Sequence, residues 1–154
     1  MKTLLVTALL AAGLAHGQLA TKKALTLEAA KQMAAAAEAE ARKNNWTMVI
    51  VIVDDGGNLM YLQKMDGTQI GSIQVAQDKA MTAIRFKRTT KALEDTVAGG
   101  RNAVLKLTGA IPIEGGIPIV VNNEYLGAIG VSGGTSPQDA QVATAGLAVV
   151  SKMK

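Results

Sequence analysis

Residues 48–59 read MVIVIVDDGGNL, and this stretch decides the fold. Met48 to Val53 is an unbroken apolar run rich in β-branched residues, which is typical of a strand buried on both faces. The polar, glycine-rich residues that follow predict a tight turn, and Leu59 to Gln63 then returns as an antiparallel partner. Strands joined by tight turns predict an antiparallel sheet with helices, which is an α+β layered fold.

A second hairpin is expected further along the chain. Residues 117–121 and 125–131 flank Asn122-Asn123-Glu124, a turn whose asparagines tolerate positive φ. We also expect a short additional strand near residues 111–113.

Four helices complete the pattern. The first is capped by Thr26 and runs to about Lys43, the second spans residues 72–86, and a short third one ends near Val97. The last starts with Ser136 as its N-cap and Pro137 at its first position. Its sequence is apolar nearly all round from 142 to 150, so we expect burial on more than one side. So much apolar surface on one chain predicts a homo-oligomer.

The N-terminus predicts export. One lysine, an apolar run from Leu4 to Leu14 and the small residues of Ala15-His16-Gly17 are typical of a secretory signal peptide. The run is too short to span a membrane, so we expect no membrane span. We therefore predict a signal peptide over residues 1–17, a single domain over residues 18–154, and a periplasmic or secreted protein.

The composition excludes several kinds of chemistry. The chain has no cysteine, and its one histidine, His16, lies in the predicted signal peptide. The mature protein then lacks the imidazole and thiolate of Ser-His-Asp and Cys-His catalysis, of the usual zinc sites and of common haem ligation, and we expect no metal site of these kinds. A formal charge of +4 without a dense basic run, and 3% aromatic residues, argue against nucleic acid.

Two glycine clusters form the first candidate site. Glu114-Gly115-Gly116-Ile117-Pro118 enters one strand of the second hairpin, and Gly130-Val131-Ser132-Gly133-Gly134 leaves the other. In an antiparallel hairpin these segments are neighbours at one end of the sheet. Glycines there allow a ligand to approach the backbone and free N–H groups to face an anion. The alternative is that they only form bulges and turns.

A stripe on the second predicted helix forms another candidate. Val75, Lys79, Thr82 and Phe86 follow a 4-3-4 spacing, so they share one face beside the apolar core. Lys79 is then placed where its ammonium reaches a cleft, or it is a lysine on a solvated edge. Asp66, before this helix, is either a general base or a turn former.

Several motifs occur in an order that is specific to one family. They are LTLEAA at 25–30, VDDGGNL at 53–59, MDG at 65–67, Lys79-Ala80 with Thr82-Ala83, GGIP at 115–118, and GAIGVSG at 127–133 with Asp139. Over about residues 25–152 the chain thus resembles the GlcG/HbpS haem-binding family, which is related to the C-terminal domain of PduO-type proteins.

This resemblance implies a profilin-like fold with an antiparallel sheet of about five strands, and homo-oligomers of up to eight chains. It implies haem or another tetrapyrrole as ligand, and a redox- or iron-sensing role in exported members. By position, the implied ligand region comprises Asp66, Lys79, Thr82, Gly115, Gly116, Pro118, Gly130, Ser132 and Gly133. Because the mature chain lacks histidine, haem iron would need a tyrosine, methionine, lysine, carboxylate or hydroxyl group instead.

Three hypotheses follow for the function. In the first, the exported protein binds haem or another small anionic ligand near the glycine clusters, where Lys79 meets its carboxylates and Phe86 and Ile117 give apolar contact. In the second, it is an enzyme that moves a proton on a small hydroxy- or oxo-acid, with Asp66 or Glu114 as base and Lys79 as electrophile; no catalytic residue is assigned. In the third, the apolar faces only build an oligomer that senses a partner.

Overall fold

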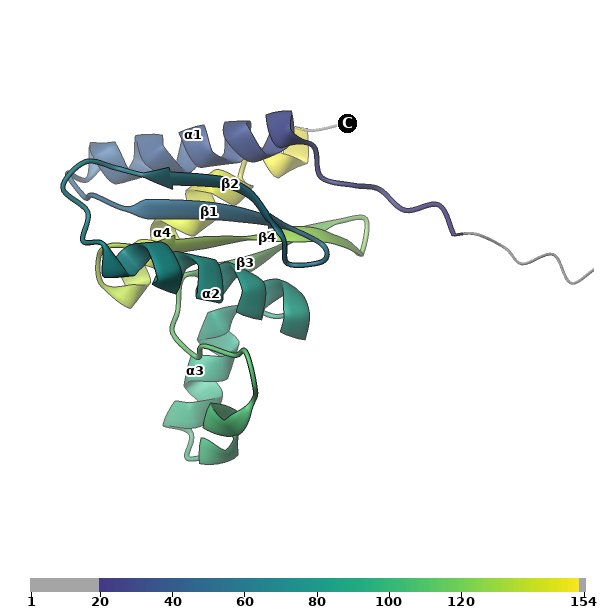
Figure 1. Cartoon of the computed structure of the whole chain (residues 1–154), viewed down its shortest axis with the longest axis vertical. Helices are drawn as coiled ribbons and strands as arrows, with labels where there is room; N and C mark the ends of the chain where they lie inside the picture. Colours follow the sequence, from purple (N-terminus) through teal and green to yellow (C-terminus); the bar gives the residue numbers. More distant parts are fainter. Residues whose placement is uncertain (1–19, 153–154) are drawn as a thin grey trace, which may run out of the picture.

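The computed structural model describes residues 20–152, so the predicted signal peptide lies outside the described residues. A four-stranded antiparallel sheet, with strand order β2-β1-β4-β3, is sandwiched between helices (Figure 1). In chain order the elements are α1 (Leu27–Lys43), β1 (Val49–Asp54), β2 (Leu59–Lys64), α2 (Gly71–Phe86), α3 (Thr90–Ala98), the 3-10 helix η1 (Asn102–Lys106), β3 (Gly116–Val121), β4 (Glu124–Ser132), α4 (Ser136–Leu147) and the 3-10 helix η2 (Val150–Lys152).

The strand β1 organises the core because both of its faces are buried. Ile50 and Ile52 point to the layer that contains α1 and α4. Val49, Val51 and Val53 point to the opposite layer, under α2. Because side chains alternate between the two faces of a strand, one unbroken apolar run contributes to both core layers. The prediction of a doubly buried strand and of an α+β fold is therefore confirmed.

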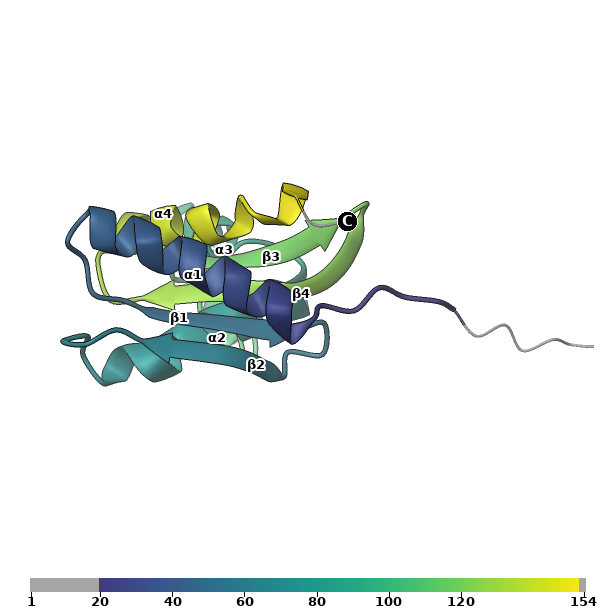
Figure 2. The ribbon, with the colours of Figure 1, turned by 90° about the horizontal axis from the view of Figure 1, so that it is seen from above.

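The helices α1 and α4 lie side by side over one face of the sheet (Figure 2). Small side chains on α1 bring the two helices and the sheet close together. Thr26 caps α1 as predicted, since its Oγ1 accepts a hydrogen bond from the N–H of Ala29 at 3.1 Å. Within residues 20–152, no helix is both long and apolar enough to cross a membrane.

The start of α4 differs by one residue from the prediction. Thr135, not Ser136, is the N-cap, and it forms a capping box with Gln138, whose Oε1 accepts from the N–H of Thr135 at 2.9 Å. A threonine followed three residues later by a glutamine satisfies two of the free N–H groups at a helix start. This pairing outweighs the preference for proline at the first helical position.

The predicted burial of α4 on more than one side is wrong for the single chain. Only Val142, Ala143 and Gly146 are buried among its small and apolar residues, and the helix ends at Leu147. Residues 148 and 149, between α4 and η2, are exposed and half-buried, respectively. The apolar surface left over is the reason to expect a further partner.

The sheet has four strands in the described residues, slightly fewer than the five or so expected. Residues 111–113 are irregular, because the N–H of Ile111 donates to Thr82 Oγ1 at 2.9 Å instead of to a neighbouring strand. The turn at 122–123 follows the prediction, with φ of 50° and 64° at the two asparagines. The helix α3 and η1 project from the sheet as an arm (Figure 1), on which Leu105 and Leu107 are exposed.

Candidate functional site

The two glycine clusters meet at one end of the sheet, as predicted. Gly116 on β3 pairs with Gly130 on β4, and the N–H of Val131 donates to the carbonyl of Gly115 at 3.0 Å. The strand β1 begins and β2 ends at the same place. We call this the glycine-rich end of the sheet and the opposite end, with the two hairpin turns and the start of α1, the turn end.

Protein atoms already fill the space beside these glycines. A Cβ atom on Gly130 would lie 2.1 Å from the carbonyl oxygen of Ala76, and one on Gly116 would lie 2.3 Å from that of Lys79. Both carbonyls belong to α2. The glycines therefore let a helix backbone lie directly on the sheet, and they leave no room for a ligand at these two positions.

Lys79 lies inside the molecule instead of at the edge of a cleft. Its side chain is 1% exposed, and its Nζ donates to Asp139 Oδ2 at 2.7 Å and to the carbonyl of Val131 at 3.1 Å. Gly115, with φ of 125°, makes space for this pair, because a Cβ there would lie 2.9 Å from Lys79 Nζ. The predicted contact of Lys79 with a surface ligand, or its use as an electrophile, would require breaking the ion pair.

Asp139 joins three segments through this contact. Its Oδ1 accepts from the N–H of Gly134 at 3.0 Å, and its Oδ2 binds Lys79. Burial raises the pKa of the Asp139 carboxyl above its ordinary value, and the hydrogen bond and charge of Lys79 act in the opposite direction. The pair thus joins α2, the end of β4 and the first turn of α4. Its role is structural.

Thr82 and Ser132 also have structural partners. Thr82 is fully buried, and its Oγ1 holds the 109–111 loop against α2. Ser132 Oγ donates to Ser72 Oγ at 3.1 Å, which ties the end of β4 to the start of α2. Neither hydroxyl faces one of the two cavities described below.

The remaining predicted residues are dispersed. Asp66 is exposed in a turn with Gly67, whose φ is 81°, so it occupies a turn-forming position. Gly133 accepts from Gln69 Nε2 at 3.3 Å at the same end of the sheet. Phe86 is half-buried at the far end of α2, and Pro118 is half-buried on β3, at the edge of the sheet. The structure does not bring these side chains together around one space.

The cavities lie at the turn end, where the sequence indicated no site. The larger one, the α1–β3 groove, has a volume of about 1080 Å³. It lies between the start of α1, the strand β3 and the chain after α4. Its apolar lining consists of Ala24, Leu25, Ala29, Ile119, Val120, Val121, Leu126, Leu147 and Val150, and its polar lining of Lys23, Thr26, Glu28, Gln32, Asn122 and Ser151.

A smaller cavity, the Lys87 pocket, adjoins this groove. Its volume is about 330 Å³, and Lys23 and Leu126 line both cavities. The half-exposed apolar residues before α1 and at the end of β3 were the only sequence signal for these spaces, and such residues are common on surfaces. Among residues 20–152, no three histidine, cysteine, aspartate or glutamate side chains are grouped so that they could hold a metal ion.

Known proteins share both the sequence and the fold. The family model described as "Haem degrading protein HbpS-like" matches residues 25–148. Protein GlcG of Escherichia coli K12 is 42% identical over 112 residues, which cover 73% of this chain and 84% of GlcG. A double mutant of HbpS from Streptomyces reticuli superposes with a TM-score of 0.80 at 30% identity, over 97% of this chain and 99% of that one.

A third similar structure is a complex of PduOC with haem. It has a TM-score of 0.75 and 27% identity, and the match covers 82% of this chain and 94% of PduOC. These likenesses extend over the sheet and the helices on both of its faces.

Proposed function

This chain belongs to the HbpS-like family, and we propose on this basis that it binds haem or a related tetrapyrrole. The complex of the similar PduOC with haem supports the ligand class. The observation in this chain that carries the proposal is the α1–β3 groove, because it combines a large volume with an apolar lining.

Size favours the groove over the other cavity and over the glycine-rich end. Pockets for ligands the size of cofactors and drugs have volumes of about 300–1,000 Å³ and are mostly apolar. At about 1080 Å³ the groove lies just above this range and has room for a broad planar macrocycle, whereas the Lys87 pocket, at about 330 Å³, lies at the bottom. Leu25, Val120 and Leu147, which are partly exposed, would contact the macrocycle.

The donor groups of the groove fit the periphery of haem better than its iron. Lys23 is the one basic side chain in the lining and would pair with a propionate, while Glu28 opposes a second one nearby. The lining contains no imidazole, thioether or phenol, and His16 lies outside the described residues. We infer that haem is held by apolar contact and one ion pair, with no strong protein ligand on the iron.

A hemin titration tests this proposal. Adding hemin to the protein from residue 18 onward should give a saturable, shifted Soret band, with the broad spectrum of iron that lacks a strong axial ligand. A sharp spectrum of iron with two strong axial ligands would contradict the inferred mode of binding. Uptake that never saturates would contradict specific binding altogether.

We further propose that the protein forms a homo-oligomer. Leu105 and Leu107 on the arm are 57% and 41% exposed, and α4 leaves part of its apolar surface uncovered. Such surfaces favour self-association. Size-exclusion chromatography with light scattering should show an assembly of several chains, and Leu105→Glu should reduce its mass. A wild-type monomer at micromolar concentration would contradict this part of the proposal.

Export and a redox- or iron-sensing role complete the proposal. Mass spectrometry of the protein from its own source should give a chain that begins at Gln18, since Ala15-His16-Gly17 has the small residues of a cleavage site. A full-length chain in the cytoplasmic fraction would contradict export. A sensing role predicts that oxidation of bound haem iron changes the assembly state, which light scattering would report.

A further inference from the structure

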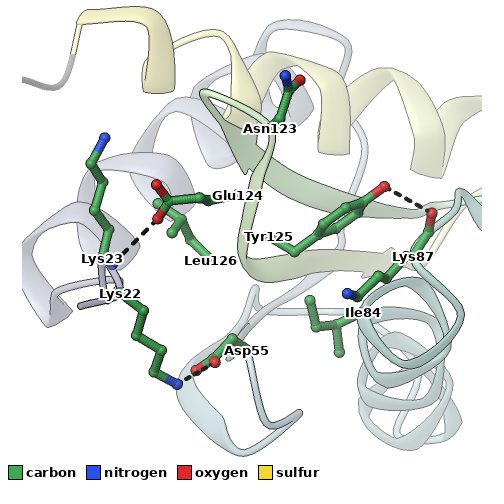
Figure 3. A pocket seen from close by; sticks show the side chains of 9 residues that line it. All are labelled: Lys22, Lys23, Asp55, Ile84, Lys87, Asn123, Glu124, Tyr125 and Leu126. Atoms are coloured by element: carbon green, nitrogen blue, oxygen red, sulfur yellow. Dashed lines mark hydrogen bonds and ion pairs between the residues drawn. The ribbon is translucent and has the colours of Figure 1, made fainter. Parts of the chain in front are cut away.

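The Lys87 pocket has features of a second binding site. It lies between the chain before α1, the C-terminal end of α2 and the start of β4 (Figure 3). Its volume is about 330 Å³. At about a third of the volume of the α1–β3 groove, the pocket suits a ligand much smaller than a tetrapyrrole.

Lys87 has an unusual backbone conformation at the edge of this pocket. It ends α2 with φ of 50° and ψ of 43°, the left-handed region that helices normally reserve for glycine or asparagine. A lysine in this region costs free energy that must be recovered elsewhere. The hydroxyl of Tyr125 donates to the carbonyl of Lys87 at 3.3 Å, and Lys87 Nζ lies 5.1 Å from the centre of the Tyr125 ring. One tyrosine thus contacts both the backbone and the ammonium of Lys87.

The charges of the pocket leave this ammonium available. Three lysines and two acids line it, and with the Lys23 side chain directed away from the space, two charges of each sign remain. Asp55 pairs with Lys22, and Glu124 accepts from the backbone N–H of Lys23 at 3.4 Å. Figure 3 shows the Lys23 side chain directed away from this space and the Lys87 ammonium directed into it, near Ile84. Among the described residues, Lys87 forms no salt bridge.

We propose that the Lys87 pocket binds a small monocarboxylic acid. The carboxylate lies against Lys87 Nζ, beside the Tyr125 ring, and the apolar part of the acid contacts Ile84 and Leu126. One available ammonium matches one carboxylate, and the two neighbouring acids repel a ligand of higher negative charge. This site adjoins the proposed haem groove, with which it shares Lys23 and Leu126, and it differs from the groove in size and in chemistry.

The test compares butyrate with butyramide, which has the same shape and no charge. Each is titrated into the protein from residue 18 onward at constant ionic strength, and binding is followed by calorimetry and by amide NMR shifts. Butyrate should bind with a dissociation constant on the order of 1 mM and shift the signals of Ile84, Lys87 and Tyr125. Butyramide should bind at least about fivefold more weakly, because it cannot form the ion pair. Equal binding of the two compounds would overturn the proposal.

Two variants locate the charge that matters. Lys87→Gln removes the ammonium and leaves a polar side chain that is one atom shorter, and it should weaken butyrate binding at least about fivefold. Lys31→Gln, on the exposed face of α1 outside both cavities, removes the same charge and should bind like the wild type. Equal affinities of Lys87→Gln and the wild type would overturn the proposal.

The same variants distinguish a free acid from a haem propionate. If Lys87→Gln weakens hemin binding and leaves butyrate binding unchanged, the ammonium serves haem and the proposal fails. If wild-type protein binds butyrate through Lys87 but never saturates with hemin, the haem proposal fails and this one stands.

Discussion

The two ends of the sheet contain the same kinds of residue, but one end is closely packed and the other contains the cavities. At the glycine-rich end, α2 lies on the sheet so closely that Gly116 and Gly130 have no space for a Cβ atom, and the ion pair of Lys79 with Asp139 is sealed inside. At the turn end, two cavities open between α1, the hairpin turns and the chain after α4. There, Lys87 lines a pocket and forms no salt bridge among residues 20–152.

This difference shows what glycine clusters and lysines in a sequence leave undecided. A glycine permits the close approach of whatever lies beside it, and that is either a ligand or a helix. Likewise, a lysine next to an apolar stripe either faces a cleft or finds a buried carboxylate. In this molecule the helix and the carboxylate occupy the positions where the sequence suggested a ligand.

Removal of Lys79 should have the largest effect. In Lys79→Met the carboxyl of Asp139 stays buried without its cation, which costs about 3–5 kcal/mol of the free energy of unfolding at neutral pH. Because burial raises the pKa of Asp139, the folded variant takes up a proton at a higher pH than the unfolded chain does. Its stability should therefore be best preserved in acid and should fall as pH rises through the folded pKa. Urea denaturation between pH 4 and pH 8 measures this, and a deficit that grows toward acid pH would contradict the burial argument.

Filling the space at Gly130 should have the next largest effect. In Gly130→Ala the new methyl meets the carbonyl of Ala76 and the N–H of Ala80, so α2 must move away from the sheet. Overpacking of this kind costs about 1–3 kcal/mol or more. Gly71→Ala is the control, since nothing lies within 4 Å of a Cβ at that position, and it should be neutral or slightly stabilising. Equal unfolding midpoints of the two variants would show that the close approach is not needed.

Introducing a negative charge at each end of the sheet should show which end binds haem. Val120 lines the α1–β3 groove and is 42% exposed, whereas Ile70 is 80% exposed near the glycine-rich end. Val120→Glu should weaken hemin binding at least about tenfold, equivalent to about 1.4 kcal/mol, because the carboxylate lies against the macrocycle. Ile70→Glu should leave the affinity unchanged. The reverse result, measured by Soret titration, would place haem at the glycine-rich end.

Removal of Lys22 should have the smallest effect. It forms an ion pair with Asp55 at the turn end, but it is largely exposed. Exposed pairs contribute little because water and salt screen them. The urea midpoint of Lys22→Gln should therefore coincide with that of the wild type. A clear loss of stability would show that the chain before α1 is held more firmly than its exposure indicates.

Local signals predicted the elements well. The Thr26 cap and the alanine face gave the bounds of α1, and the run before Asp54 gave β1, because both patterns act over neighbouring residues. Thr135 and Ser136 are both suitable N-cap residues for α4. The pairing of Thr135 with Gln138 decides between them. The missing strand at 111–113 has a different cause, since Thr82, about 30 residues earlier in the chain, takes its backbone N–H.

The candidate site was much less predictable. Lys79 and Asp139 are 60 residues apart, and nothing in either local sequence shows that they meet. The α1–β3 groove is assembled from residues at the start of α1, on β3 and after α4, and the LTLEAA motif within it indicates the family and not a cavity.

The sequence by itself determined the α+β class, the doubly buried strand β1, the hairpin turns and the family, because periodicity and motif order are properties of the chain alone. Only the tertiary structure decided which glycines face a helix and which lysines have an acidic partner among the described residues. The physical reason is that burial and charge pairing depend on distances between segments remote in the chain, and those distances exist only once α2 lies against the sheet.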